Sequence, residues 1–208
     1  MPRKSRRLLG ETVCHHMVQG INKEEIFKTE DNKEKYIELL KKYYKEFKID
    51  IIAYCIMDNH VHMLLYANDI KQISNFMKNI NSIYAMYYNK KTDRVGYVFR
   101  NRFKSVPIMD RKQLYTCIKY IHMNPVKAGK VKEESDYRYS SYNDYLNKTG
   151  FIHEEILKFI FNSLFIISIP PTNMLLIASL LKLLLQSIID QYDIEIIFAV
   201  IDRLEIDF

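Results

Sequence analysis

Apolar residues follow two different rhythms along the first two thirds of the chain, and each rhythm predicts a different element. Residues 12–18 and 49–57 are rich in β-branched and aromatic side chains, which is typical of strands. The stretch HVHMLLY at 60–66 follows Asp58-Asn59, a dipeptide that favours tight turns. We therefore expect 49–57 and 60–66 to pair as an antiparallel hairpin.

Three helices are predicted around these strands. From Asn32, and again over 70–87, apolar residues recur every three or four positions with polar residues between them. A strand-like segment, GYVFRNRFKSVPI at 96–108, separates the second helix from the third. We expect the third helix to be capped by Asp110 and to end near Asn124, because the proline that follows disfavours helical backbone at that residue.

The element order β-α-β-β-α-β-α predicts an α+β fold of the ferredoxin-like or RRM-like type, an antiparallel sheet with helices packed on it. The composition changes beyond Tyr145, so we place one domain at residues 1–146 and a helical C-terminal extension at 147–208. The apolar run of the extension is too short to span a bilayer. We expect it to pack on the body or on a second chain, and no membrane is predicted as a partner.

The net charge of +6 conceals two parts of opposite sign. Residues 1–150 carry 28 Lys and Arg against 17 Asp and Glu, whereas 151–208 carry 3 against 8. A basic body favours an anionic polymer as partner, although a lysine-rich solvated surface is the alternative. Three widely spaced cysteines are typical of a reducing compartment, and no apolar signal core follows the basic N-terminus. The cytoplasm is therefore the expected location.

Two histidines in the predicted hairpin are candidate metal ligands. Alternate side chains of a strand share a face, so His60 and His62 point the same way and could chelate one divalent ion. On the third helix, Tyr120 and Asn124 lie one turn apart beside the expected apolar stripe. An amide and a phenol held together there could supply a metal ligand and a nucleophile. A purely structural histidine pair and a tyrosine that only packs remain the alternatives.

Basic residues in the segment before that helix alternate with apolar ones. Arg100, Arg102 and Lys104 would line one face of a strand, which suits the phosphate backbone of a nucleic acid. An ordinary solvated strand face is an equally simple explanation of the same pattern.

The motifs MDNHVHMLL, RFKS, YIHMNPVKAGKV and YRYSSY occur in an order and spacing that resemble the REP-associated tyrosine transposases. These are relatives of the single-tyrosine transposases of small insertion sequences, within the HUH endonucleases. The resemblance runs from the N-terminus to about Tyr145, and the tail after about residue 163 has no part in it. The tail is a divergent helical extension, a dimerisation element, or the product of a frameshift.

The resemblance implies a transposase that cleaves and rejoins single-stranded hairpin DNA through a covalent 5′-phosphotyrosine. It makes Tyr120 the nucleophile and assigns His60, His62 and Asn124 to a site for Mg²⁺ or Mn²⁺. It also implies hairpin recognition, for which the basic residues are the candidates: Arg3, Lys4, Arg6, Arg7, Arg100, Arg102 and Lys104.

Other readings of the sequence predict different outcomes. A domesticated relative that binds hairpin DNA without cutting it would use the same basic face. A nucleotide hydrolase with a histidine nucleophile tends to need a further histidine at position 64, which is Leu64 here. An RNA-binding α+β module would need exposed sheet aromatics that the sequence does not indicate. Whether the protein is a monomer or a homodimer that exchanges its tyrosine helix stays open.

Overall fold

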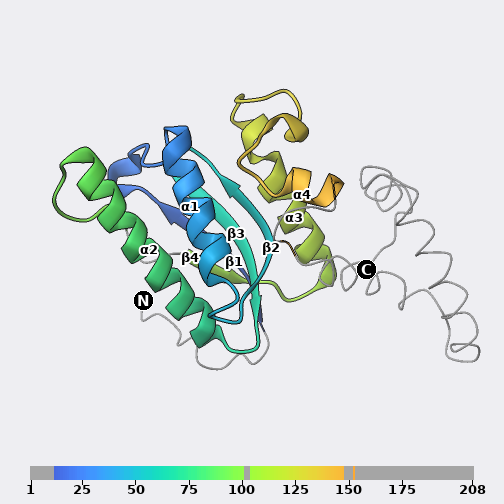
Figure 1. The fold of residues 1–208 in the computed structure, drawn as a ribbon. Coiled ribbons are helices and arrows are strands. Elements are labelled where there is room, and N and C mark those ends of the chain that lie inside the picture. The colour runs from blue at the N-terminus through green and yellow to red at the C-terminus, as the bar shows by residue number, and fades with distance from the viewer. Residues whose placement is uncertain (1–11, 101–103, 148–151, 153–208) are drawn as a thin grey trace, which may run out of the picture.

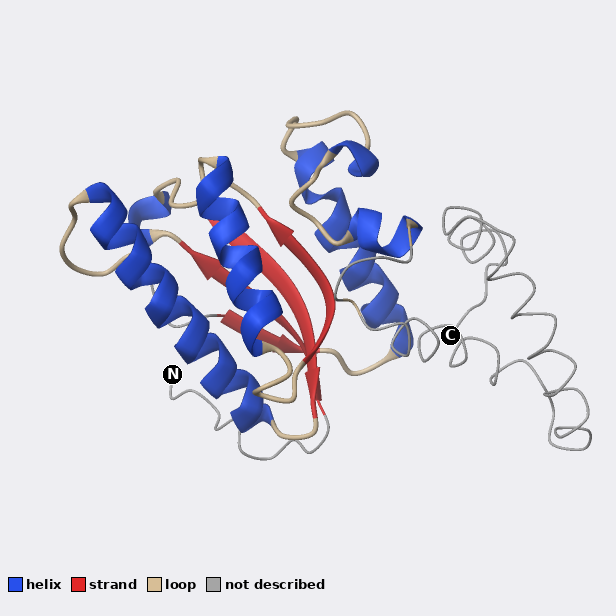
Figure 2. Cartoon of the chain, in the orientation of Figure 1, coloured by secondary structure: helices blue, strands red, loops and turns tan. Residues whose placement is uncertain are grey.

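Four strands form a single antiparallel sheet with helices on both of its faces (Figures 1 and 2). The computed structural model describes residues 12–100, 104–147 and 152. The strand order is β2-β3-β1-β4, and every pair of neighbours is antiparallel. This order confirms the predicted ferredoxin-like fold. The strands are β1 (Thr12–Gln19), β2 (Asp50–Ile56), β3 (His60–Ala67) and β4 (Lys104–Pro107).

Helices α1 (Glu30–Tyr43) and α2 (Ile70–Thr92) lie side by side over one face of the sheet (Figure 1). Three rings, of Phe27, Tyr36 and Tyr84, pack with centroids 4.8–5.3 Å apart. The two phenols still meet acceptors: Tyr36 donates to Asn81, and Tyr84 donates to the backbone carbonyl of Ile26. Burial of these aromatic groups without loss of hydrogen bonds makes this side of the core well specified.

The first helix begins before its predicted start at Asn32. It begins at Glu30 because the hydroxyl of Thr29 accepts from the backbone N–H of Asn32 and caps it. It ends at Tyr43, so Tyr44 and Phe47 lie in the turns that follow, where they still pack against the core. Apolar spacing alone could not place this end, because the turn continues the same rhythm of buried residues.

Helix α3 (Arg111–Lys127) packs against β2 and β3 from the other side of the sheet. Asp110 caps it as predicted, accepting from the N–H of Gln113 at 2.7 Å. The predicted end near Asn124 is wrong, because the helix continues through Pro125. Pro125 lacks the N–H that would bond the carbonyl of Ile121, but the side-chain amide of Asn124 lies 3.5 Å from that carbonyl. In the next turn Ala128 still donates to the carbonyl of Asn124 at 3.0 Å.

The chain beyond α3 returns to the sheet. A 3₁₀ turn, η3 (Glu134–Asp136), and the short helix α4 (Tyr142–Leu146) follow. The N–H of Ser141 donates to the carbonyl of Tyr54, and the hydroxyl of Tyr137 donates to the carbonyl of Ile56. These bonds tie residues 137–141 to β2, at the outer edge of the sheet. The predicted extension at 147–208 lies outside the described residues, apart from Asn147 and Ile152.

The segment at 96–108 is only partly a strand. Phe99 bridges to Gly20, and β4 begins at Lys104, with residues 101–103 outside the described part of the chain. Among the helices that the structure describes, none is long and apolar enough to cross a membrane.

Candidate active site

The two histidines of β3 share one face of the sheet. Their ring centroids are 4.8 Å apart, as the alternation of a strand requires. His60 lies opposite Gln19 of β1, while His62 lies opposite Met17 and, on its other side, Cys55 of β2. His60 is half-buried at the end of the strand, whereas His62 is only 2% exposed. The pair thus begins at the protein surface and reaches inward.

Both imidazoles are bonded to the protein through the same ring atom. Nδ1 of His60 lies 2.5 Å from Oδ1 of Asn59, and Nδ1 of His62 lies 3.0 Å from Nε2 of His15. Burial lowers the pKa of His60, and it lowers the pKa of His62 to about 3, with His60 and His15 adding to the effect. The rings are therefore neutral at physiological pH, and the Nε2 atom of each is left for a ligand.

Helix α3 carries the predicted tyrosine to this pair. The ring centroid of Tyr120 is 5.3 Å from that of His62 and 6.0 Å from that of His15. Leu114, Ile118 and Ile121 are buried as the sequence predicted, and they hold the helix on the sheet. Tyr120 itself is 40% exposed, so its phenol is open to solvent beside two buried imidazoles.

The amide of Asn124 is oriented by the helix. Its Nδ2 donates to the backbone carbonyl of Tyr120 at 2.7 Å. It also lies 3.5 Å from the carbonyl of Ile121, which has no helical donor because Pro125 lacks an N–H. The amide nitrogen is thereby occupied, and the oxygen is the atom left to bind a ligand. Asn124 and Tyr120 lie together on one flank of α3, as predicted.

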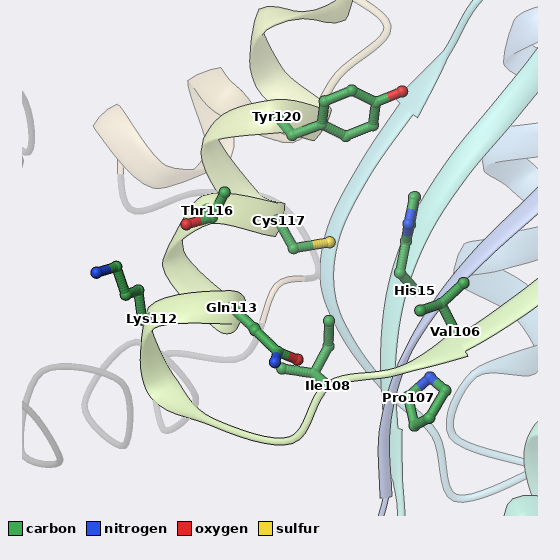
Figure 3. Close-up of a pocket in the computed structure, with 9 residues that line it drawn as sticks. All are labelled: His15, Val106, Pro107, Ile108, Lys112, Gln113, Thr116, Cys117 and Tyr120. Atoms are coloured by element: carbon green, nitrogen blue, oxygen red, sulfur yellow. The ribbon is translucent and has the colours of Figure 1, made fainter. Parts of the chain in front are cut away.

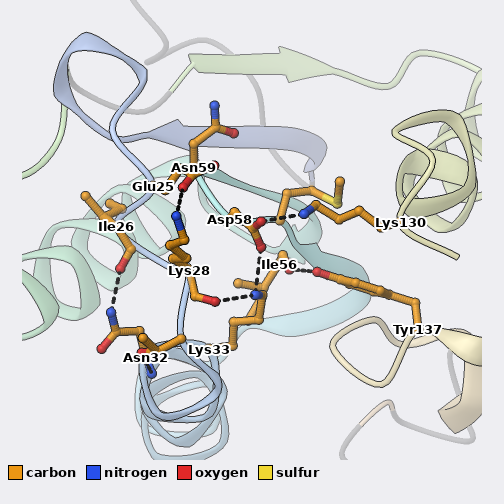
Figure 4. Close-up of polar contacts among 12 residues, drawn as sticks. Glu25, Ile26, Lys28, Asn32, Lys33, Ile56, Asp58, Asn59, Lys130 and Tyr137 are labelled. Atoms are coloured by element: carbon orange, nitrogen blue, oxygen red, sulfur yellow. Dashed lines mark hydrogen bonds and ion pairs between the residues drawn. The ribbon is translucent and has the colours of Figure 1, made fainter.

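A turn built on ion pairs holds the start of β3 (Figure 4). Asp58, which precedes His60 by two residues, accepts from Lys33 of α1 at 2.8 Å and from Lys130, just beyond α3. The side chain of Lys33 is 7% exposed and also donates to the carbonyl of Lys28. Burial alone would raise the pKa of Asp58, but the hydrogen bonds from the two lysines hold it below its usual value. One carboxylate thus joins α1, the histidine hairpin and the end of the tyrosine helix.

The donor atoms fit a divalent ion. Two neutral imidazoles with their Nδ1 atoms bonded elsewhere match the usual state of ligating histidines. This state requires His62 to donate its Nδ1–H to Nε2 of His15. Within the described ranges, no three His, Cys, Asp or Glu side chains form a metal cluster, so a third protein ligand would be the Asn124 amide oxygen. Imidazole nitrogens suit divalent transition-metal ions, whereas Mg²⁺ prefers oxygen donors and would draw most of its ligands from Asn124, substrate and water.

Two of the basic residues predicted to bind DNA are described by the structure, and they lie at different places relative to the site. Lys104 of β4 lies opposite Met17, on the face that carries His15, and its charge contributes to a lowered pKa of His15 after burial. Arg100 is exposed beyond the Phe99–Gly20 bridge, and its N–H donates to the carbonyl of Gln19. The remaining candidates lie outside the described residues: Arg3, Lys4, Arg6, Arg7 and Arg102.

Two residues of the site were not predicted. His15 is on β1, two positions from Met17, so its place beside His62 follows from the β1–β3 register, which the sequence does not specify. Lys127 places its ammonium 5.3 Å from the ring centroid of Tyr120, at a separation of seven residues on α3. Helical spacing would have found Lys127 if the helix had not been expected to end at Asn124.

Comparison with known proteins agrees with this geometry. The sequence model of the IS200-like transposases matches residues 11–124, more than half of the chain. The chain belongs to the IS200-like transposase family. This match begins at β1 and ends at Asn124, so it spans the histidine pair and the tyrosine of the candidate site. DNA transposase is accordingly the class of this protein.

Similar proteins belong to the same group. A Haemophilus influenzae protein described as a REP-associated tyrosine transposase is 28% identical over 122 residues, 52% of this chain and 69% of the relative. A solved structure of a REP-associated tyrosine transposase bound to a REP hairpin has a TM-score of 0.57 and 16% identity, and the match covers 74% of this chain and 91% of that one. This likeness confirms the fold. A transposase structure from Deinococcus radiodurans, with 15% identity over 57% of this chain and 97% of that chain, has a TM-score of only 0.41.

Proposed function

We propose that this transposase cleaves and rejoins single-stranded DNA beside hairpins, with Tyr120 as the nucleophile and a divalent metal held by His60, His62 and Asn124. One observation carries the proposal: the phenol of Tyr120 is exposed, and its ring centroid lies 5.3 Å from that of His62. The solved relative that is bound to a REP hairpin supports a DNA hairpin as the partner.

The reaction balances with the groups present. Tyr120 Oη attacks the scissile phosphorus, its proton passes to solvent, and the P–O3′ bond breaks. The products are a 5′-phosphotyrosine link and a free 3′-hydroxyl. A 3′-hydroxyl of the same or another strand then attacks the phosphotyrosine and rejoins DNA without an external energy source. A bound Mg²⁺ or Mn²⁺ would supply charge stabilisation to the phosphate oxygens during both steps.

Side chains around the phenol have separate tasks in this scheme. In this scheme Lys127, whose ammonium lies 5.3 Å from the ring centroid of Tyr120, and Lys104 of β4 attract the phosphates that flank the scissile one. His15 holds the Nδ1 atom of His62, which keeps the ring oriented. Because Tyr120 lies beside the histidines of its own chain, the geometry supports cleavage in cis. A homodimer stays a prediction.

A covalent-trapping assay tests the proposal. Purified protein is incubated with a pool of labelled single-stranded hairpin oligonucleotides and Mn²⁺, then denatured and separated by electrophoresis. We expect an adduct that survives denaturation, that is lost with EDTA, and that is lost in His62→Ala and in Tyr120→Phe. Tyr115→Phe is the matched control, because Tyr115 is half-buried on the same helix and, five residues before Tyr120, is turned about 140° from it around the helix axis. Binding of the oligonucleotides without any adduct would instead favour a non-catalytic hairpin-binding protein.

A further inference from the structure

A groove next to Tyr120 extends beyond the residues that take part in the reaction described above. It lies between the edge strand β4 and the first half of α3, and its volume is about 480 Å³ (Figure 3). That volume is within the range of about 300–1,000 Å³ typical of small-ligand sites. Its lining residues are Val106, Pro107, Ile108, Lys112, Gln113, Thr116 and Cys117, with His15 and Tyr120 at the end nearest the candidate active site.

We propose that this groove holds one unpaired base of the DNA strand, the base of a nucleotide adjoining the scissile phosphate; this inference rests on the proposed function. The groove shares His15 and Tyr120 with the reacting centre, so whatever occupies it is a direct neighbour of the phosphate under attack. In Figure 3 the hydroxyl of Tyr120 points away from the groove, while its ring closes the near end. The phosphate and the base therefore occupy different sides of the same ring.

The walls suit the flat face of a base. Val106, Pro107 and Ile108 form an apolar wall on the sheet side, and Cys117 of α3 faces them. Val106 is 44% exposed although it is apolar, so the wall is open to solvent in the protein alone. Covering such a surface with an aromatic base removes apolar area from water on both partners.

One polar group in the groove has a fixed orientation. The Oε1 atom of Gln113 accepts from the backbone N–H of Met109 at 3.1 Å, while the N–H of Gln113 donates to the Asp110 cap. The carboxamide is thereby held from its oxygen end, which leaves Nε2 as the group that can meet a ligand. An amide nitrogen donates only, so it would select a base that presents a ring nitrogen or a carbonyl oxygen.

The charges and the strand edge favour a nucleic acid over a peptide. Lys112 lies at the rim of the groove, and Lys104 lies two residues before Val106 on the same strand. These two cations can accompany the phosphates that flank the bound base. A peptide adding itself to this edge would need backbone donors along β4, and Pro107 has none.

An abasic scan coupled to a groove variant tests the inference. In the oligonucleotide that the wild-type protein cuts, each base near the cleaved phosphate is removed in turn, and single-turnover cleavage is measured. We expect one abasic position to slow wild-type cleavage by about 30-fold, the middle of the range for loss of one stacked base. Val106→Asp should slow cleavage of the intact strand. Removing the base at the sensitive position should then slow cleavage by this variant no more than about twofold further, because the contact with that base is already lost. Val95→Asp is the matched control: it makes the same substitution at a valine that is 96% exposed and outside the groove lining, and this variant should behave as the wild type.

Crosslinking provides a readout that does not depend on cleavage. The same oligonucleotide carrying 5-iodouracil at successive positions is irradiated with the protein, and the attached tryptic peptide is identified. Attachment at the sensitive position to residues 105–111 or 113–119 is expected. The inference would be overturned if Val106→Asp stayed as sensitive to the missing base as the wild type, or if crosslinks formed only outside these two peptides. In either case the cleavage itself would stand. If the wild-type protein forms no adduct with any strand, the proposed function fails first, and crosslinks confined to other segments would reject the groove independently.

Discussion

Removing one charge from the turn before His60 should destabilise the whole domain, because Asp58 neutralises a buried lysine. In Asp58→Asn, the Lys33 ammonium, 7% exposed, loses its carboxylate partner and keeps the neutral carbonyl of Lys28 and the ring of Tyr139 (Figure 4). Loss of one partner from a buried ion pair costs about 3–5 kcal/mol. We expect about 3 kcal/mol, at the low end, because the side chain of Asp58 is itself 19% exposed and an amide can still accept one bond.

Urea unfolding followed by far-ultraviolet circular dichroism measures this loss. With a denaturant slope of about 1–3 kcal/mol per molar urea, a loss of this size lowers the midpoint by at least about 1 M. Glu34→Gln is the matched control, because it also removes a carboxylate from an ion pair, but the pair with Arg138 is exposed and should be worth less than about 1 kcal/mol. Equal midpoints for Asp58→Asn and Glu34→Gln would refute the assignment of Asp58 as the centre of the turn.

The pH dependence of the same difference has a definite sign. The folded-state pKa of Asp58 lies below its ordinary value of 3.8, so the carboxylate contributes stability above that pH and loses it as the pH falls through the folded-state pKa. The difference in the free energy of unfolding between wild type and Asp58→Asn should therefore be full at pH 7 and shrink below about pH 4. A gap that stayed constant down to pH 3 would contradict the linkage.

Three further predictions concern other residues. His15→Phe removes the acceptor of the His62 Nδ1–H and should weaken Mn²⁺ binding by about 10- to 100-fold in calorimetry, and an unchanged affinity would separate His15 from the metal site. Gly20→Ala should lower the free energy of unfolding by about 1–3 kcal/mol, since its Cβ would lie 2.3 Å from the carbonyl oxygen of Glu24, and unfolding like the wild type would refute that close contact. Burial lowers the pKa of His122 to about 3, so below pH 6.5 its folded state resists protonation and the protein loses about 1.4 kcal/mol per pH unit from this group. His122→Gln should flatten that part of the acid unfolding profile, and an unaltered profile would assign the acid sensitivity to other groups.

The order of elements and the histidine face were predictable because both depend on local periodicity. His60 and His62 had to share a face once 60–66 was a strand, and Tyr120 with Asn124 had to share a flank once α3 was a helix. The end of α3 was not predictable from the proline rule, because Pro125 removes only the donor to the carbonyl of Ile121, and the amide of Asn124 lies 3.5 Å from that carbonyl. The expected end at Asn124 also concealed Lys127.

Features that depend on pairing between distant segments were beyond the sequence. His15 meets His62 only because β1 pairs with β3 in one particular register, and a shift of one residue would turn His15 to the other face. The Asp58 bridge joins residues 25 and 72 positions apart, and neither separation leaves a periodic signal. The groove beside β4 requires the packing of α3 against an edge strand, which no local pattern specifies. The residues assigned to the metal and to DNA by resemblance stay predictions until they are tested chemically.

The central claim is that Tyr120 becomes covalently joined to DNA, and peptide mapping of the trapped adduct tests it most directly. Trypsin cuts after Lys112, Lys119 and Lys127, so Tyr115 and Tyr120 fall on different peptides, QLYTCIK and YIHMNPVK. After nuclease digestion of the adduct formed with Mn²⁺, we expect the nucleotide mass on YIHMNPVK, through a phosphotyrosine at its single tyrosine. A nucleotide on QLYTCIK, on any other peptide, or on none would contradict the account.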